Sequence, residues 1–542
     1  MKNYILIPLL TVFFIGDLHA AKPAQPGKAT TKRVAPRIAP QKKYTGSTTG
    51  PKVFSNTKNN LVRSQISSAI GLMKSGQYAQ AATSFLNLSR RPEAIKERPQ
   101  IKYLLGLCLM ELNLNQVAAF QFVDVIKSTD KKWTRQAIEK LLVATDRLGD
   151  ETLLNYAIQR IDVASVPQQN RDMLFFRLGE IKSKAGLHGD AAALYSKVGS
   201  KSRYYFSALY NKGLAQAEAN QTDLALQSFQ RLLDARSSGK VTDTNKVAAQ
   251  MAIARILYQK KDWEKSIEAY SKIPRDHFMW HDAMFEKSWA MLRGARFRSS
   301  LSNFQSLHST FYEDAYIPET LLLRAIVYLY ICKYDEMEKV VGLFEKQYLP
   351  TATSINSFLN NKSVAEAYFL EIQKINILRN DPESRKKLNL PYNVLKYISE
   401  EGNVRRSYAY LKKLAEEKKL IDENPVIRNS TLGSYAVRIL NNRIKTTKDT
   451  IGEMARAQLL SMKSEIRELK EQASFIRYEM INGRKEFLKK KLSGKNLDEV
   501  QVDDDQDRSF YVQNGYEYYP FQGEYWLDEV GNYHYLGKQS CE

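Results

Sequence analysis

The feature that most limits the fold of this chain is a short sequence pattern that returns at a nearly constant interval. Small residues stand in the middle of successive apolar stretches, and each stretch is followed by a polar or glycine-marked turn and a second apolar stretch. A pattern copied at this interval predicts stacked structural units, and not a single active site. The residues at this place are Ala69, Gly106, Leu142, Gly179, Gly213, Ala254, Ser288 and Ala325, with Leu142 in place of a small residue in the third unit. They are spaced by 37, 36, 37, 34, 41, 34 and 37 residues.

Each unit contains two helical patterns, and most of the second patterns also carry a small residue. A large apolar residue follows four places later. Two antiparallel helices pack closely only where small residues stand at the crossing, so Gly213 and Ala225 are expected to lie opposite each other. A single pair leaves one apolar face bare, so the units must stack. The second-helix residues are Ala81, Ala118, Ala191, Ala225, Ser266 and Ser300, followed by Phe85, Phe122, Tyr195, Phe229, Tyr270 and Phe304.

These residues resemble the tetratricopeptide repeat, a helix-turn-helix family with a basic period of 34. The resemblance covers residues 61–350 in about eight units and implies an all-α solenoid. In this family the first helix of each unit lines a concave groove, which implies protein partners bound as an extended peptide or a helix. The alternative is that several of these residues belong to the core of imperfect repeats. By phase, the groove residues are Tyr103, Met110, Phe176, Glu180, Tyr210, Met251, Arg255, Tyr258, Phe285 and Trp289.

The first sixty residues predict export. Residues 1–20 have the charged, apolar and small-residue order of a secretory signal peptide. Residues 21–60 hold nine Lys or Arg and no acid, which predicts a disordered basic linker. That linker is either a solvated spacer or a tether to an anionic cell-wall or lipid surface. The net charge of +22 would suit nucleic acid in a cytosolic protein, but export to the periplasm or outer cell envelope predicts no nucleic-acid partner.

Residues 351–430 are expected to form a helical extension, and residues 431–495 a long coiled-coil-like helix. The apolar residues of the long helix alternate by three and four, with one stutter. Two alternatives remain open for this seam: it packs back on the array, or it pairs with a partner helix or a second copy over 431–490. The seam residues are Val437, Leu440, Ile444, Thr447 and Ile451, then Met462, Ile466, Leu469, Ala473, Ile476 and Met480.

Residues 496–542 form an acidic, aromatic tail. Alternation on both sides of Gly531 and Asn532 predicts a small β-hairpin, which needs to dock on something to be stable. Docking through Tyr525, Trp526, Tyr533 and Tyr535 is expected on helices of this chain or of a partner. A cap on 351–430 is favoured over a plug in the groove. The tail loosely resembles the aromatic C-termini of envelope repeat proteins from gliding and predatory bacteria.

No motif for catalysis stands out. His277 and His281 are four residues apart, but two histidines without a third ligand favour a structural role. Of the three cysteines, Cys108 and Cys332 are expected to be buried free thiols, with a bridge to Cys541 as the alternative. We therefore expect no cofactor, no metal and no enzymatic activity. The expected function is an exported scaffold that assembles envelope proteins, with a self-associating structural component as the alternative.

Overall fold

The computed structural model describes residues 54–128, 132–150, 152–158, 168–235, 243–362, 364–378, 385, 387–492 and 524–535. Within these ranges the chain is helical and contains no strand. The expected signal peptide and most of the basic linker lie outside them. The linker ends earlier than expected, because the first helix already begins at Phe54, shortly after the last helix-breaking proline, Pro51.

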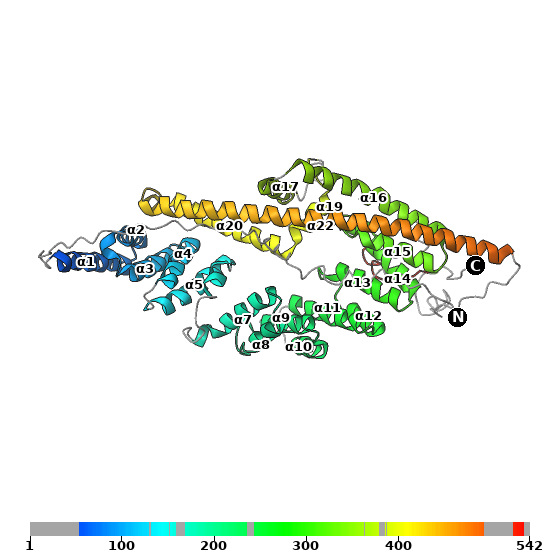
Figure 1. Ribbon diagram of the computed structural model, residues 1–542, viewed down its shortest axis with the longest axis horizontal. Coiled ribbons are helices and arrows are strands. Elements are labelled where there is room, and N and C mark those ends of the chain that lie inside the picture. The colour runs from blue at the N-terminus through cyan, green and yellow to red at the C-terminus, as the bar shows by residue number, and fades with distance from the viewer. Residues whose placement is uncertain are drawn as a thin grey trace, which may run out of the picture.

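Eight antiparallel helix pairs follow one another along the described part of the array (Figure 1). This arrangement confirms the expected all-α solenoid. The third pair has the shortest second helix of the eight, with seven described residues. The pairs are α1 (Phe54–Lys74) with α2 (Tyr78–Ser89), α3 (Arg98–Glu111) with α4 (Asn115–Lys127), α5 (Thr134–Leu148) with α6 (Thr152–Ile158), α7 (Gln168–Lys184) with α8 (His188–Tyr195), α9 (Tyr205–Glu218) with α10 (Thr222–Asp234), α11 (Asp243–Gln259) with α12 (Trp263–Ser271), α13 (Trp280–Arg293) with α14 (Phe297–Leu307), and α15 (Pro318–Tyr330) with α16 (Tyr334–Asn361).

The turn inside each pair repeats the same backbone geometry. One residue of every turn has a positive φ, between 57° and 77°. In seven of the eight turns the next amide closes the turn on a carbonyl five residues back, as Leu114 does on Leu109. The positive-φ residues stand 37, 36, 37, 34, 41, 34 and 37 residues apart, the same intervals that the sequence predicts: Gly76, Asn113, Gly149, Gly186, Asn220, Lys261, Ala295 and Cys332.

Glycines of the first helices allow the close crossing within a pair. A Cβ added at Gly213 would lie 2.7 Å from the ring of Phe229, and one added at Gly106 would lie 2.5 Å from the ring of Phe122. The ring therefore fills the space in which a side chain would stand. The atoms nearest to an added Cβ at Gly213 belong to Phe229, and Ala225, which is expected opposite Gly213, is also fully buried.

Beyond the array the chain stays helical. The second helix of the eighth pair continues past residue 350, with Pro350 inside it, to Asn361. The structure describes four shorter helices after it: α17 (Ala365–Leu378), α19 (Tyr392–Glu400), α20 (Gly402–Glu423) and α21 (Pro425–Arg428). None of the helices within the described ranges is long and apolar enough to span a bilayer.

The longest element is α22 (Thr431–Leu492), whose 62 residues extend for about 90 Å at 1.5 Å per residue. It runs along the molecule above the array and contacts α2 and α4 near its start, and α15, α16 and α17 further along (Figure 1). The seam residues Leu440, Ile451, Met462, Ile466, Leu469, Ala473, Ile476 and Met480 are buried against these helices of the same chain. The expected pairing of this seam with a partner helix or a second copy is therefore wrong, because the seam is already filled.

Two large apolar cores lie at the two ends of α22. The first joins pairs one to three and the first half of α7 with α20, α21 and the start of α22, up to Leu440. The second joins pairs seven and eight with α17, α19 and the later part of α22, from Ala455. The middle pairs, α7 to α12, contribute smaller separate clusters. A single continuous helix therefore ties the two ends of the array together.

The tail residues 524–535 dock on the seventh pair. The Tyr535 amide donates to Ser302 Oγ at 2.7 Å, and the Gly531 amide donates to Ser306 Oγ at 2.8 Å. Val530 is buried to 1% exposure. The favoured cap on 351–430 is thus wrong, because the contacts of this segment are with α14, the second helix of its pair, and with the residues just before and at the start of α13.

The expected β-hairpin is also corrected in this segment. Residues 524–535 contain a tight turn, closed by the amides of Glu529 and Val530 on the Trp526 carbonyl, but no paired strands. The rings of Tyr525 and Tyr533 still meet across the turn, with centroids 6.1 Å apart. The segment has the shape of a hairpin, but the amides of Gly531 and Tyr535 donate hydrogen bonds to serines of α14.

The cysteines differ from the expectation at one position. Cys108 is free and buried, and burial raises the pKa of its thiol to about 12. Cys332, expected to be a free thiol, is disulfide-bonded. Cys541 lies outside the described residues.

Candidate partner-binding groove

Five of the ten predicted groove residues are buried in the array, so they offer no surface to a partner: Tyr103, Met110, Phe176, Met251 and Trp289. The reason is packing between neighbouring pairs. Tyr103 stacks on Trp133 with ring centroids 5.2 Å apart, and Phe176 stacks on Tyr204 at 5.4 Å. Both partners come from the segment just before the next pair, where the repeat pattern has no fixed position. These five assignments are corrected to core residues.

The other five residues are half-buried: Glu180, Tyr210, Arg255, Tyr258 and Phe285. Glu180 accepts a hydrogen bond of 2.8 Å from Arg177 on the same helix. The remaining four lie on the first helices of three successive pairs, α9, α11 and α13. We call Tyr210, Arg255, Tyr258 and Phe285 the middle groove.

A half-buried carboxylate links two of the helices that carry the middle groove. Glu286 of α13 receives two hydrogen bonds from Arg255 of α11, at 2.6 and 2.8 Å, and one of 2.8 Å from the Tyr270 hydroxyl of α12. Burial alone would lower the pKa of Arg255, but the hydrogen bonds and charge of Glu286 raise it. The guanidinium is therefore permanently charged, and its position is set by two neighbouring helices.

The aromatic members of the groove keep polar tips. Burial raises the pKa of Tyr210, which lies near the Arg255 charge. Burial also raises the pKa of Tyr258, although a hydrogen bond with Arg293 opposes the shift. The Tyr258 ring meets Trp263 edge-on at 5.0 Å. Two hydroxyls, one guanidinium and the apolar Phe285 ring can bind an extended peptide through both its backbone and its side chains.

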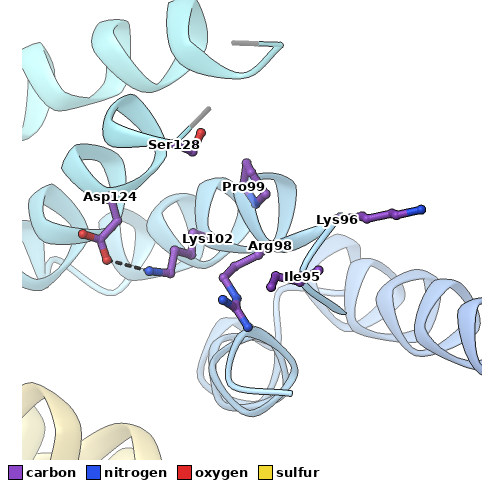
Figure 2. Close-up of a pocket in the computed structure, with 7 residues that line it drawn as sticks. All are labelled: Ile95, Lys96, Arg98, Pro99, Lys102, Asp124 and Ser128. Atoms are coloured by element: carbon purple, nitrogen blue, oxygen red, sulfur yellow. Dashed lines mark hydrogen bonds and ion pairs between the residues drawn. The ribbon is translucent and has the colours of Figure 1, made fainter. Parts of the chain in front are cut away.

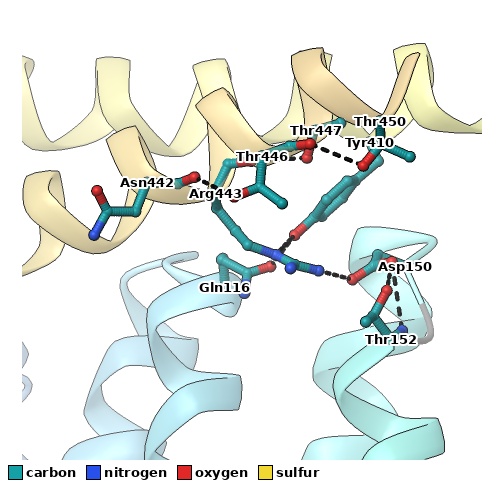
Figure 3. Close-up of polar contacts among 9 residues, drawn as sticks. All are labelled: Gln116, Asp150, Thr152, Tyr410, Asn442, Arg443, Thr446, Thr447 and Thr450. Carbon is teal, nitrogen blue, oxygen red and sulfur yellow. Dashed lines mark hydrogen bonds and ion pairs between the residues drawn. The ribbon is translucent and has the colours of Figure 1, made fainter. Parts of the chain in front are cut away.

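One polar clasp fixes the start of α22 to the early pairs (Figure 3). Arg443 of α22 donates to the Tyr410 hydroxyl of α20 at 3.0 Å and to Asp150 of the third pair at 2.9 Å. Tyr410 in turn donates to Gln116 of α4 at 2.6 Å. Glu417 of α20 accepts from the Gln116 amide at 2.8 Å, where it caps the N-terminus of α4. Burial raises the pKa of Glu417 to about 8, although the backbone donors oppose this shift.

A second clasp fixes the later part of α22 to the eighth pair. Arg477 donates to Glu345 at 2.6 and 3.0 Å and to Glu338 at 3.0 Å, both on α16. Neither clasp was predicted from the sequence. The sequence does place Glu338 and Glu345 seven residues apart on one helix face, which indicates a site for a basic partner. That spacing does not identify Arg477 as the partner.

Comparison with known proteins identifies the repeats. Residues 68–132 match the family described as "Tetratricopeptide repeat", and residues 207–236 match a second family model of the same description. The chain contains tetratricopeptide repeats. The matches coincide with the first and second pairs and with the fifth pair, which include the glycine crossings at Gly106 and Gly213.

One solved structure is similar to this chain at low sequence identity. The chain is similar to a solved structure titled "Crystal Structure of Rap Protein Complexed with Competence and Sporulation Factor", with 10% identity over 73% of this chain and 99% of that one. The TM-score is 0.24, too low for any conclusion about this protein. No curated protein matches the chain.

A pair of carboxyl groups lies where the last tetratricopeptide unit meets α22. Burial raises the pKa of Glu319 on α15 to about 7, and the nearby Glu465 raises it further. Burial likewise raises the pKa of Glu465 to about 7, while the hydrogen bond of 3.2 Å from the Tyr316 hydroxyl opposes this. Both carboxyl groups therefore titrate near neutral pH at the contact between α15 and α22.

A recess of about 550 Å³ lies beside the second tetratricopeptide unit (Figure 2). Two of its three basic side chains, Arg98 and Lys102, already have partners. Lys102 donates to Asp124 at 2.6 Å, and Arg98 donates to the carbonyls of Ser89 and Arg91. The recess therefore carries no assigned role.

Within the described ranges no group of side chains could hold a metal ion, and His277 and His281 make local contacts instead. The His281 ring lies against Tyr312, with centroids 4.3 Å apart, and burial lowers its pKa to about 4. His277 Nδ1 accepts from the Met279 amide at 3.2 Å, just before α13. Both contacts are local packing contacts at the start of the seventh tetratricopeptide unit.

Proposed function

We propose that this chain is a non-enzymatic scaffold that binds a segment of a partner protein along the middle groove. The observation that carries the proposal is the set of half-buried side chains Tyr210, Arg255, Tyr258 and Phe285 on α9, α11 and α13. Their positions are set by contacts of Glu286 and by pair-to-pair packing, so little ordering free energy is lost on binding. Tetratricopeptide repeats are interaction modules, which supports this reading.

The proposed location is the periplasm or outer cell envelope, with other envelope proteins as partners. The signal-peptide pattern of residues 1–20 supports it. Cell fractionation should find a mature chain that begins near Ala21 outside the cytoplasm. An uncleaved cytosolic chain would remove this part of the proposal and leave the groove untouched.

Photo-crosslinking in cells tests the groove directly. A photoreactive amino acid at Tyr210 or Phe285 should capture a partner, while the same group at Gln227, exposed on the second helix α10, should not. An added Arg255→Met change should weaken capture at Phe285, because it removes the two hydrogen bonds that join α11 to Glu286 of α13. Equal capture at all three positions would show that the groove is not the binding site.

A further inference from the structure

The last turns of α22 expose a row of apolar side chains. Tyr478, Ile481, Leu488 and Leu492 are 59%, 59%, 56% and 87% exposed. We call these four residues the end stripe. They are distinct from the buried seam, whose last member is Met480.

The end stripe lies partly beyond the helix on which α22 packs. The two helices run antiparallel, since Lys463 donates to Asn356 at 2.6 Å and Arg477 to Glu345 at 2.6 Å. Arg484 then pairs with Asp335, in the first turn of α16. Because α16 begins at Tyr334, residues 485–492 of α22 extend past its end, as the tip of the long helix in Figure 1 shows.

One exposed lysine stands within the end stripe, and a lysine–glutamate ion pair lies at its edge. At 100° per residue the four apolar side chains fall within an arc of about 80°. Lys485 lies inside this arc and Lys489 lies at its edge, and both are exposed. Glu479 and Glu486 project from a different part of the helix, about 80–100° beyond Tyr478. Glu486 forms an ion pair with Lys489 at 2.9 Å, so the charge within the apolar arc itself is that of Lys485.

We propose that the end stripe docks on the surface of an anionic lipid bilayer. Leucine, isoleucine and tyrosine side chains enter the boundary of head groups and acyl chains, while lysines extend toward the phosphates. Each lysine near an anionic surface adds attraction, and the net charge of +22 acts in the same direction. The proposal is independent of the groove and of its partner.

Other occupants fit less well. A second copy would bury Lys485 of each helix among the apolar side chains of the other, at the cost of taking its charge out of water. A stable protein interface covers roughly 800 Å² on each partner, and four partly exposed side chains supply only about half of that area. A bilayer needs no matching surface and supplies the negative charge.

Vesicle flotation of the full chain tests the proposal. Binding is expected to vesicles of phosphatidylcholine with about one-third phosphatidylglycerol, and not to phosphatidylcholine alone. The triple variant Ile481→Gln, Leu488→Gln, Leu492→Gln should bind roughly tenfold more weakly or worse. Leu460→Gln, at an exposed position on the same helix but far from its end, is the matched control and should bind like the unchanged chain.

A charge variant, Lys485→Glu, gives a second measurement that alters neither the apolar side chains nor the ion pair of Lys489 with Glu486. It should lose binding to the anionic vesicles and retain the melting temperature. Unchanged flotation of the triple or the charge variant would overturn the proposal, as would equal binding to neutral vesicles. A dimer in light scattering that the triple variant dissociates would assign the end stripe to a second copy instead.

Discussion

At the scale of single residues, one glycine in the first helix decides how closely a pair can pack. The crossing at Gly213 has no room for a Cβ, which would stand 2.7 Å from Phe229. Gly71, in α1, has no atom within 4 Å of an added Cβ. The same chemical change therefore has opposite effects at the two sites, which makes them a matched pair.

We expect Gly213→Ala to lower the free energy of unfolding by about 1–3 kcal/mol, because the Phe229 ring must move. Gly71→Ala should raise it by up to about 1 kcal/mol, the difference in helix propensity. Chemical denaturation of the two variants checks both signs. A loss of stability at Gly71 equal to that at Gly213 would contradict the crossing.

The carboxyl pair Glu319 and Glu465 makes packing of α22 depend on pH. Their pKa values, about 7 in the folded protein, lie above the ordinary value near 4.5. Between these values the folded state binds more protons than the unfolded state, so stability falls as pH rises from about 4.5 to about 7. The effect is of the order of 1.4 kcal/mol for each unit of pKa difference.

Glu465→Gln should remove part of this dependence, because glutamine stays neutral and still accepts from Tyr316. Melting temperatures measured from pH 5 to pH 8 should fall for the unchanged chain and fall less for the variant. Glu453→Gln, at an exposed position of α22, is the control and should follow the unchanged chain. Parallel curves for all three proteins would show that the pair does not titrate in this range.

At the scale of elements, the repeat phase was predictable because it rests on contacts within about forty residues. Small residues, turns and rings recur at fixed offsets, and the positive-φ positions reproduce the intervals. Contacts between distant segments were not predictable. A heptad seam such as Met462 and Ile466 predicts that another helix packs on it, but it does not identify that helix. In the structure, α15 and α16 pack on this seam. Burial of Tyr103 and Phe176 likewise depends on Trp133 and Tyr204, which lie outside the pattern.

The docked tail offers a test at this scale. Val530 is 1% exposed and Leu527 is 63% exposed, three residues apart in one turn. Val530→Asp should release residues 524–535 from α14, because a buried charge has no partner there. Leu527→Asp should leave the tail in place. Hydrogen exchange at Gly531 and Tyr535, whose amides bind Ser306 and Ser302, reports release. Equal protection in both variants would mean that Val530 does not anchor the segment.

At the scale of the whole molecule, α22 sets the separation of the two cores. The early pairs hold its start through Arg443 and Leu440, and the late pairs hold its end through Arg477 and Ile476. The middle pairs between them have smaller apolar clusters, so the free energy of local unfolding is expected to be lower there than at the two ends. The curvature of the middle groove therefore depends on the stiffness of a helix that lies outside it.

A break in α22 between the two cores tests this dependence. Lys445 is exposed and stands between Leu440 and Ile451. Lys445→Pro removes one helical hydrogen bond and clashes with the preceding turn, at a cost of about 3 kcal/mol. Both cores should stay folded, because each has its own buried residues, but they should move relative to each other. Small-angle scattering should show a broader distribution of distances, and crosslinking at Phe285 should weaken as the groove loses its fixed curvature. Lys445→Gln leaves the helix intact and should change neither measurement. Identical scattering of the proline variant and the unchanged chain would show that the middle pairs hold their curvature without the long helix.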